Sequence, residues 1–185
     1  MNALYQKLQH ATSARASREA LAQFVAQNPH LMPELFAIAT DFKDKIHHKA
    51  AWIIDILSVS NPRLFQKLIP EFCAVLPFIP DEESLRPFAR AAWMLVSQSE
   101  FPITHEQKNM VADACFDWLI AERKVATKMY AIRTLYFLGK APEFPEIHET
   151  LKTIISEDAH KHSYAYQAVA REILQKMKKS NLKLK

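Results

Sequence analysis

Glycine is nearly absent from this chain of 185 residues, with Gly139 as its single example, whereas proline occurs ten times. Hairpin turns need residues at positive φ angles, which glycine adopts without strain, and phosphate-binding loops need several glycines. Proline, in contrast, is well tolerated in the first turn of a helix. The composition therefore excludes a hairpin-rich fold and a glycine-rich phosphate loop, and it predicts helices joined by short turns that begin with proline.

Cysteines and long apolar runs are also scarce. Cys73 and Cys115 fit no zinc-binding spacing and have apolar neighbours, which predicts buried, unreactive thiols in a reducing compartment. The longest apolar runs, such as 91–96, are far shorter than the roughly 18 residues needed to cross a bilayer. Residues 1–9 lack a signal-peptide pattern. We therefore expect a cytoplasmic protein that does not enter a membrane.

The positive charge of the chain is concentrated at its C-terminal end. The formal net charge is +4, but residues 176–185 contain five lysines and no acid, so the remaining sequence carries a formal charge of −1. Proteins that bind nucleic acid normally carry positive charge on the folded surface, because neutralising phosphates supplies most of the affinity. We expect a nearly neutral folded body and a frayed basic tail over 180–185. The alternative is that these lysines steer acidic partners, nucleic acid or anionic lipid.

What the sequence does contain is a series of helix start signals. Asparagine precedes proline at 28–29 and 61–62, Asp81 precedes two glutamates, and Thr104 has a glutamine three residues later. These signals predict an all-α fold of about ten helices, the eighth capped at its C-terminal end by Gly139. The predicted helices are 2–9, 13–27, 30–41, 44–59, 62–76, 82–98, 105–122, 124–138, 145–157 and 161–179.

A short pattern recurs along these helices. Lys49-Ala50-Ala51-Trp52 returns 41 residues later as Arg90-Ala91-Ala92-Trp93, Ala131-Ile132-Arg133 follows in the same register, and Ala165-Tyr166-Gln167 is a looser copy. Two helices in a period of about 40 residues is the spacing of HEAT and armadillo repeats, in which small alanines let paired helices approach closely. The sequence therefore predicts an α-α superhelix of the HEAT or armadillo kind, formed by a single domain over 1–179.

A basic residue accompanies the alanines in three copies of the pattern, namely Lys49, Arg90 and, close by, Lys128. HEAT families place a cation here that pairs with an acid of the neighbouring repeat. The nearest acids in the sequence are Asp44, Glu83 and Glu122. We therefore expect salt bridges between successive repeats.

Four segments resemble a family of small bacterial HEAT-like proteins: 49–53 (KAAWI), 114–120 (ACFDWLI), 134–140 (TLYFLGK) and 165–168 (AYQA). The resemblance spans nearly the whole chain and implies a HEAT-like fold. Members of that family often carry the label adenylosuccinate lyase. Genuine lyases of that kind need a catalytic serine on a mobile loop rich in Ser, Gly, Met, Pro and Lys, whereas this chain has no such loop and less than half the length. We interpret the label as mistaken, so the resemblance implies no activity.

The histidines and serines form no pattern typical of a metal or catalytic site. His47 and His48 are adjacent, so on a helix their side chains point about 100° apart, and His160 and His162 flank a lysine at a helix start. No serine lies in a G-x-S-x-G context. We expect solvated histidines, no metal, no cofactor and no catalytic residue, and we predict that the chain is not an enzyme.

The tryptophans indicate a candidate binding surface. The predicted core stripe of the helix over 44–59 is Ile46, Ala50, Ile53 and Leu57. Trp52 points about 150° away from this stripe, and the same phase places Trp93 and Arg133 on the inner side of later helices, which lines the concave surface of a solenoid. The alternative is that each ring is buried against the next repeat. The predicted concave-face residues are Lys45, His48, Trp52, Asp55, Arg86, Trp93, Met129 and Arg133.

The favoured hypothesis is a non-enzymatic scaffold that binds a protein or peptide on its concave helical surface, because tryptophan and arginine commonly act as interface anchors. The alternative is a nucleic-acid-binding protein related to the HEAT-like DNA alkylation glycosylases, which use tryptophans and an aspartate in a basic channel. Trp52 and Asp55 resemble that arrangement, although their spacing of three differs from the four typical of that family. The body charge of −1 argues against a basic channel.

Overall fold

A computed structural model describes residues 3–98 and 102–182 of the chain. Within these two ranges the chain forms ten α-helices and four short 3-10 helices and contains no strand. The prediction of an all-α fold with about ten helices is therefore confirmed.

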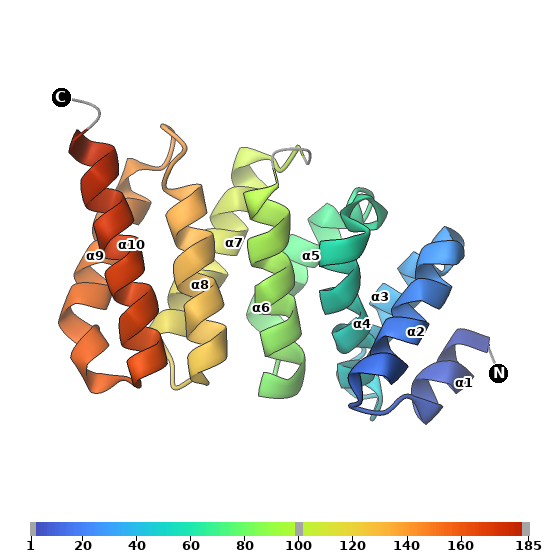
Figure 1. The fold of residues 1–185 in the computed structure, drawn as a ribbon. Coiled ribbons are helices and arrows are strands. Elements are labelled where there is room, and N and C mark those ends of the chain that lie inside the picture. Colours follow the sequence, from blue (N-terminus) through green and yellow to red (C-terminus); the bar gives the residue numbers. More distant parts are fainter. Residues whose placement is uncertain (1–2, 99–101, 183–185) are drawn as a thin grey trace. The chain divides into compact units, whose positions relative to one another are not determined.

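The chain divides into two compact units, residues 1–103 and residues 104–185. The first unit contains α1 (Ala3–His10), α2 (Arg15–Gln27), η1 (Pro29–Leu31), α3 (Met32–Thr40), α4 (His47–Ser60), η2 (Pro62–Phe65), α5 (Ile69–Val75), η3 (Leu76–Phe78) and α6 (Glu82–Ser97) (Figure 1). The second unit contains α7 (His105–Ile120), α8 (Val125–Leu138), α9 (Pro145–Asp158), η4 (Ala159–Lys161) and α10 (Tyr164–Leu182). A single domain over 1–179 stays a prediction.

The sequence predicts a frayed C-terminal tail over 180–185. The last helix, α10, continues to Leu182, and residues 183–185 lie outside the described residues. The frayed tail therefore stays a prediction.

Most helices begin and end within a few residues of their predicted spans, but two regions differ. The helix predicted over 44–59 begins at His47, because residues 41–46 form turns in which Asp44 accepts the Ile46 N–H at 3.0 Å. The helix predicted over 62–76 is divided into η2 and α5. Pro70 accounts for the division, since proline lacks the N–H and blocks the geometry that a continuous helix requires, yet is tolerated in the first turn of α5.

The predicted start signals divide into true caps and 3-10 turns. The Asp81 carboxylate accepts the Ser84 N–H at 2.9 Å at the start of α6, and Thr104 and Gln107 form a reciprocal capping box at the start of α7. Asn28 and Asn61 precede 3-10 turns and make no side-chain cap. The Asn28 amide instead donates to the Phe24 carbonyl at 2.8 Å, so it closes α2 rather than opening the next helix.

Aromatic rings and small residues form the core of the first unit. Phe72 of α5 stacks on Phe88 of α6 with ring centroids 5.6 Å apart, and Phe36 of α3 meets Phe88 edge-on. The repeated alanine pairs, Ala50-Ala51 of α4 and Ala91-Ala92 of α6, are all buried. Because α4 packs against both α2 and α6, these small side chains explain why the pattern recurs: they let the second helix of each pair approach its neighbours closely.

The cations of the repeated pattern do not bind the acids expected from the sequence. Lys49 Nζ donates to the Gln9 carbonyl at 2.7 Å, and buried Lys128 donates to the Leu119 carbonyl at 2.8 Å. Arg90 alone of the three pairs with a carboxylate, Asp55, at 3.0 Å. In the described structure none of the three expected acids, Asp44, Glu83 and Glu122, binds these cations. The two lysines instead satisfy carbonyls in the last turns of α1 and α7, which have no partner within their own helix.

Gly139 caps α8 as predicted, and its N–H donates to the Leu135 carbonyl at 2.9 Å. Its φ of −68° is open to any residue, so backbone strain does not explain the glycine. A Cβ at this position would instead overlap the imidazole of His148 on α9. That ring stacks on Tyr136 and bonds to the Tyr136 carbonyl through Nε2 at 3.0 Å. The single glycine therefore makes room for α9 against the end of α8.

His47 joins α4 to the start of α6. Its Nδ1 lies 2.6 Å from the Asp44 carbonyl oxygen, and its Nε2 lies 2.8 Å from a carboxylate oxygen of Asp81. Both partners are acceptors, so both contacts are hydrogen bonds only when the ring is the doubly protonated imidazolium. Burial is the largest single effect and opposes the charge, but the bonds and charges of Asp81 and Asp44 outweigh it and raise the pKa of His47.

The first prediction concerns Gly139. Gly139→Ala should lower the free energy of unfolding by about 1–3 kcal/mol, because the added methyl group must displace the His148 ring. In a His148→Ala background the same substitution should be neutral or stabilise by about 0.4–1 kcal/mol, since alanine restricts the unfolded chain. Urea unfolding of the four proteins measures this, and equal destabilisation in both backgrounds contradicts the packing explanation.

The second prediction concerns the dependence of stability on pH. The raised pKa of His47 contributes stability that is complete below about pH 6.5 and is lost as the pH rises through the folded value. Burial is the largest single effect on Asp81 and acts to raise its pKa. The hydrogen bonds from His47 and Ser84 and the charge of His47 together outweigh it, so the pKa of Asp81 is lowered. Its contribution is therefore present above about pH 3.8 and is lost as the pH falls.

The wild type should exceed His47→Gln in free energy of unfolding by on the order of 1 kcal/mol near pH 5.5, and by less at pH 8. The measurement is urea unfolding at both values. The control is His30→Gln, because His30 is exposed, and its difference from the wild type should stay constant. A His47→Gln difference that grows with pH contradicts the charged pair.

Candidate binding surface

In the first unit, α2, α4 and α6 pack in one layer, with α3 and α5 behind it (Figure 1). On α4, Ala50, Ile53 and Leu57 are buried, whereas residues 52, 55 and 56 are half-buried and residue 59 is exposed. On α6, residues 86, 90 and 93 follow the same helical spacing and are exposed or half-buried. We call this stripe the inner-helix face and define it by Arg18, Trp52, Asp55, Arg86, Arg90 and Trp93.

Trp52 lies at the centre of this face and has a neighbour on each of two helices. The Arg18 guanidinium of α2 lies 5.9 Å from the centroid of its ring, which is a cation–π distance. The His48 ring, one turn earlier on α4, meets it edge-on at 5.1 Å. Trp52 and Trp93 are both half-buried, while the third tryptophan, Trp118, is buried in the core of the second unit. Trp52 is therefore held in place by its neighbours and still partly open to solvent.

Asp55 lies one turn beyond Trp52 and accepts a hydrogen bond from Arg90 Nη1 of α6 at 3.0 Å. Burial raises the pKa of Asp55, and the positive charges of Arg90, Arg86 and Arg18 lower it by less, so the pKa lies above its usual value. The charge of this carboxylate therefore depends on the three arginines around it.

A cavity of about 390 Å³ opens beside Asp55. The residues around it are Arg15, Arg18 and Glu19 of α2, Asp55, Ile56, Val59 and Ser60 of α4, and Arg90 of α6. Arg15 pairs with Glu19 at 2.7 Å, so two of the three arginines already bind a carboxylate. Ile56 and Val59 supply an apolar wall, and Val59 is 42% exposed. The cavity can therefore receive an aliphatic side chain next to hydrogen-bonding groups.

Of the predicted site residues in the first unit, all but Lys45 lie on α4 and α6. His48, Trp52 and Asp55 lie together on α4, and Arg86 is close enough to Asp55 to affect its pKa. Trp93 lies on α6, one turn beyond Arg90. Lys45, in contrast, is exposed in the turn before α4, because this helix begins only at His47, two residues later.

The remaining predicted site residues belong to the second unit. Met129 and Arg133 are half-buried on α8, and Arg133 Nη2 lies 3.2 Å from a carboxylate oxygen of Glu172 on α10. That Arg133 shares one concave surface with Trp52 and Trp93 stays a prediction.

The sequence did not indicate the contribution of α2. Arg18 reaches Trp52 from a helix that carries no copy of the alanine–tryptophan pattern, so its register relative to α4 was not visible. The one available sign was a pair of arginines, Arg15 and Arg18, three residues apart and so on one side of a helix.

The thiols offer no nucleophile. Cys73 and Cys115 are both buried, as predicted. Burial raises the pKa of Cys73 to about 11 and raises that of Cys115 as well. Both are therefore protonated at neutral pH and chemically inert.

The described residues contain neither a metal-binding cluster nor a membrane-spanning helix. Over 3–98 and 102–182, no group of three or more histidine, cysteine, aspartate or glutamate side chains is arranged to hold a metal ion. None of the helices in that part of the chain combines the length and the apolar character that a bilayer span demands.

Comparison with known proteins identifies the repeat. A family model described as HEAT repeat domain matches residues 4–177, which begin in α1 and end in α10. No curated protein and no solved structure matches the chain significantly. The match spans nearly all of the described helices and agrees with the buried alanine pairs and the period of about 40 residues. The chain therefore belongs to the HEAT repeat family, as its sequence resemblance implied.

Proposed function

We propose that this chain is a non-enzymatic interaction protein and that the inner-helix face of the first unit binds a protein or peptide segment. HEAT repeats typically act as scaffolds for protein interaction. The observation that carries the proposal is the setting of Trp52, which is ordered by Arg18 and His48, half-open to solvent and next to a cavity with mixed lining.

An ordered tryptophan suits this role because it provides a large contact area and loses little conformational freedom on binding. Trp52 is already held by contacts with a guanidinium and an imidazole. A partner side chain that covers the rest of its ring therefore gains apolar contact without ordering a loose residue. Ile56 and Val59, one and two turns further along α4, extend the apolar part of this contact.

Arg18 provides a hydrogen-bond donor at the same place. Its Nε is buried and donates no hydrogen bond within the described structure. Arg18 also lines the cavity beside Asp55 and forms no ion pair with a carboxylate in the described structure, so an acceptor brought into this cavity by a partner can bind its guanidinium there. A backbone carbonyl or a carboxylate of a peptide supplies such an acceptor, which supports a polypeptide ligand.

The charge of the first unit favours a polypeptide over nucleic acid. Residues 1–103 contain ten lysines and arginines and ten aspartates and glutamates, so the formal charge of this unit is zero. On the inner-helix face, Asp55 binds Arg90, and Glu19 binds Arg15 at its edge. The face itself has three arginines and one aspartate, but the unit around it has no net positive charge of the kind that phosphate binding needs.

The third prediction tests this face with peptides selected from a random library displayed on phage. Peptides that bind the wild type should bind Trp52→Ala and Arg18→Gln at least about tenfold more weakly, because each variant removes an anchor. Fluorescence anisotropy measures the affinities, and circular dichroism and melting temperatures report whether each variant folds. Arg18→Gln keeps the test decisive if Trp52→Ala destabilises the fold.

The matched control is Phe78→Ala, which removes another aromatic side chain of the first unit that is 72% exposed and lies outside the inner-helix face. It should leave peptide affinity unchanged. The proposal is wrong if both inner-face variants bind the peptides as tightly as the wild type does. Tighter binding of a labelled DNA duplex or RNA strand than of any peptide would favour the nucleic-acid alternative.

A further inference from the structure

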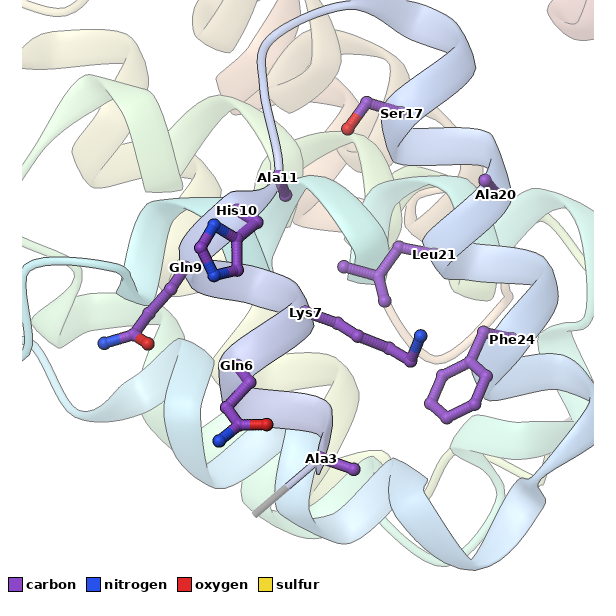
Figure 2. A pocket seen from close by; sticks show the side chains of 10 residues that line it. All are labelled: Ala3, Gln6, Lys7, Gln9, His10, Ala11, Ser17, Ala20, Leu21 and Phe24. Carbon is purple, nitrogen blue, oxygen red and sulfur yellow. The ribbon is translucent and has the colours of Figure 1, made fainter. Parts of the chain in front are cut away.

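A second recess lies at the N-terminal end of the first unit, between α1 and α2. It has a volume of about 780 Å³, and α1 contributes Gln6, Lys7 and His10 to its lining while α2 contributes Ser17, Ala20 and Phe24 (Figure 2). Buried Leu21 and Ala11 also line it. None of the residues that define the inner-helix face lines this recess, which we call the α1–α2 groove.

The groove follows from the unequal lengths and side chains of the two helices. α1 has eight residues and α2 has thirteen, so α1 covers only part of its neighbour. Leu4 and Leu8 fix α1 to the core, which leaves its polar side facing outward. On α2, Ala20 is exposed and small, so its side chain fills little of the space between the two helices.

The charge of the groove is one-sided. Lys7 and His10 line it and no acid does. Over residues 3–27 the only acid is Glu19, which binds Arg15 and does not line the groove. Both basic residues also lie in the last turn of α1, where cations offset the helix dipole. This position alone would explain why the two residues are basic.

The direction of Lys7 is not explained by the helix dipole. Its side chain extends across the groove toward α2, and Nζ lies 4.8 Å from the centroid of the Phe24 ring (Figure 2). Within the described structure Lys7 makes no ion pair with a carboxylate. The groove therefore presents an ammonium group directly beside an aromatic ring, and a ligand with a carboxylate next to an apolar side chain matches both groups.

The length of the groove limits its ligand. Eight helical residues span about 12 Å, and an extended chain covers roughly 3.4 Å per residue. Roughly three to four extended residues therefore fit along α1. The Gln6 amide on the rim can both donate and accept hydrogen bonds with the backbone of such a segment.

We propose that the α1–α2 groove is a second binding site, separate from the inner-helix face, that takes a short acidic segment of another protein with an aliphatic or aromatic side chain at its centre. The carboxylates bind Lys7 and the rim of α1, and the apolar side chain packs on Phe24, Ala20 and Leu21.

The experiment is a titration of the full-length, ¹⁵N-labelled protein, followed by NMR, with the capped peptide Glu-Asp-Leu-Phe-Asp-Glu. The expected result is saturable shift changes confined to amides of α1, α2 and the turn between them. Two capped controls separate charge from apolar contact: Lys-Lys-Leu-Phe-Lys-Lys reverses the charge, and Glu-Asp-Ser-Ser-Asp-Glu removes the apolar side chains. Both controls should bind at least about fivefold more weakly.

Variants locate the site. Lys7→Glu should weaken binding of the first peptide at least about fivefold, and Ala20→Trp, which fills the groove, should weaken it as much. Both positions are exposed, so the fold should be retained. Lys67→Glu makes the same change of charge at an exposed lysine of this unit outside the groove and should have no effect. Arg18→Gln, which tests the inner-helix face, should also leave this binding unchanged.

Several outcomes overturn the proposal: no saturable binding, equal binding of the charge-reversed peptide, or an effect of Lys67→Glu as large as that of Lys7→Glu. Shift changes centred on Trp52 and Asp55 would also overturn it, although they would support the function proposed for the inner-helix face. The two proposals can therefore fail independently.

Discussion

The close contact between the inner helices of the first unit is the constraint on which the candidate surface depends. It is made by alanines, because Ala50 and Ala51 of α4 and Ala91 and Ala92 of α6 are all buried where these helices meet their neighbours. Larger side chains here would separate the helices, and Arg90 reaches Asp55 at 3.0 Å only because they are close. The alanines therefore position the charged and aromatic residues that lie beside them on the same helices.

Helices and their close packing could be predicted because they follow local rules. Asp81 and the Thr104–Gln107 box cap helices through side chains that bond within three residues, and the alanine pattern repeats in the sequence itself. Gly139 was also predictable as a cap. The reason why this position needs a glycine could not be predicted, because the ring that excludes a Cβ belongs to His148 on the next helix. The position of that ring depends on how α8 and α9 pack.

Only part of the candidate site could be predicted from the sequence, for a related reason. Helical phase gives the direction in which Trp52 points, but its exposure depends on what another helix places over it. That group is Arg18, 34 residues earlier on a helix without the repeated pattern. Likewise, the pattern identified Lys49 and Lys128 as important cations but not their partners, which are carbonyls at helix ends rather than acids. Sequence patterns therefore located the face, and tertiary packing determined its chemistry.

The two proposed sites meet at α2, and helical phase keeps them apart. Arg15, Arg18 and Glu19 lie on one side of this helix and contribute to the cavity beside Asp55, whereas Ser17, Ala20 and Phe24 lie on another and line the groove with α1. At the first cavity, acids bind two of the three arginines, whereas the groove has a lysine and a histidine without any acid. The first surface thus suits an apolar anchor with mixed hydrogen bonds, and the second suits a segment that brings its own negative charge. A single helix, α2, can therefore present two surfaces that select different partners.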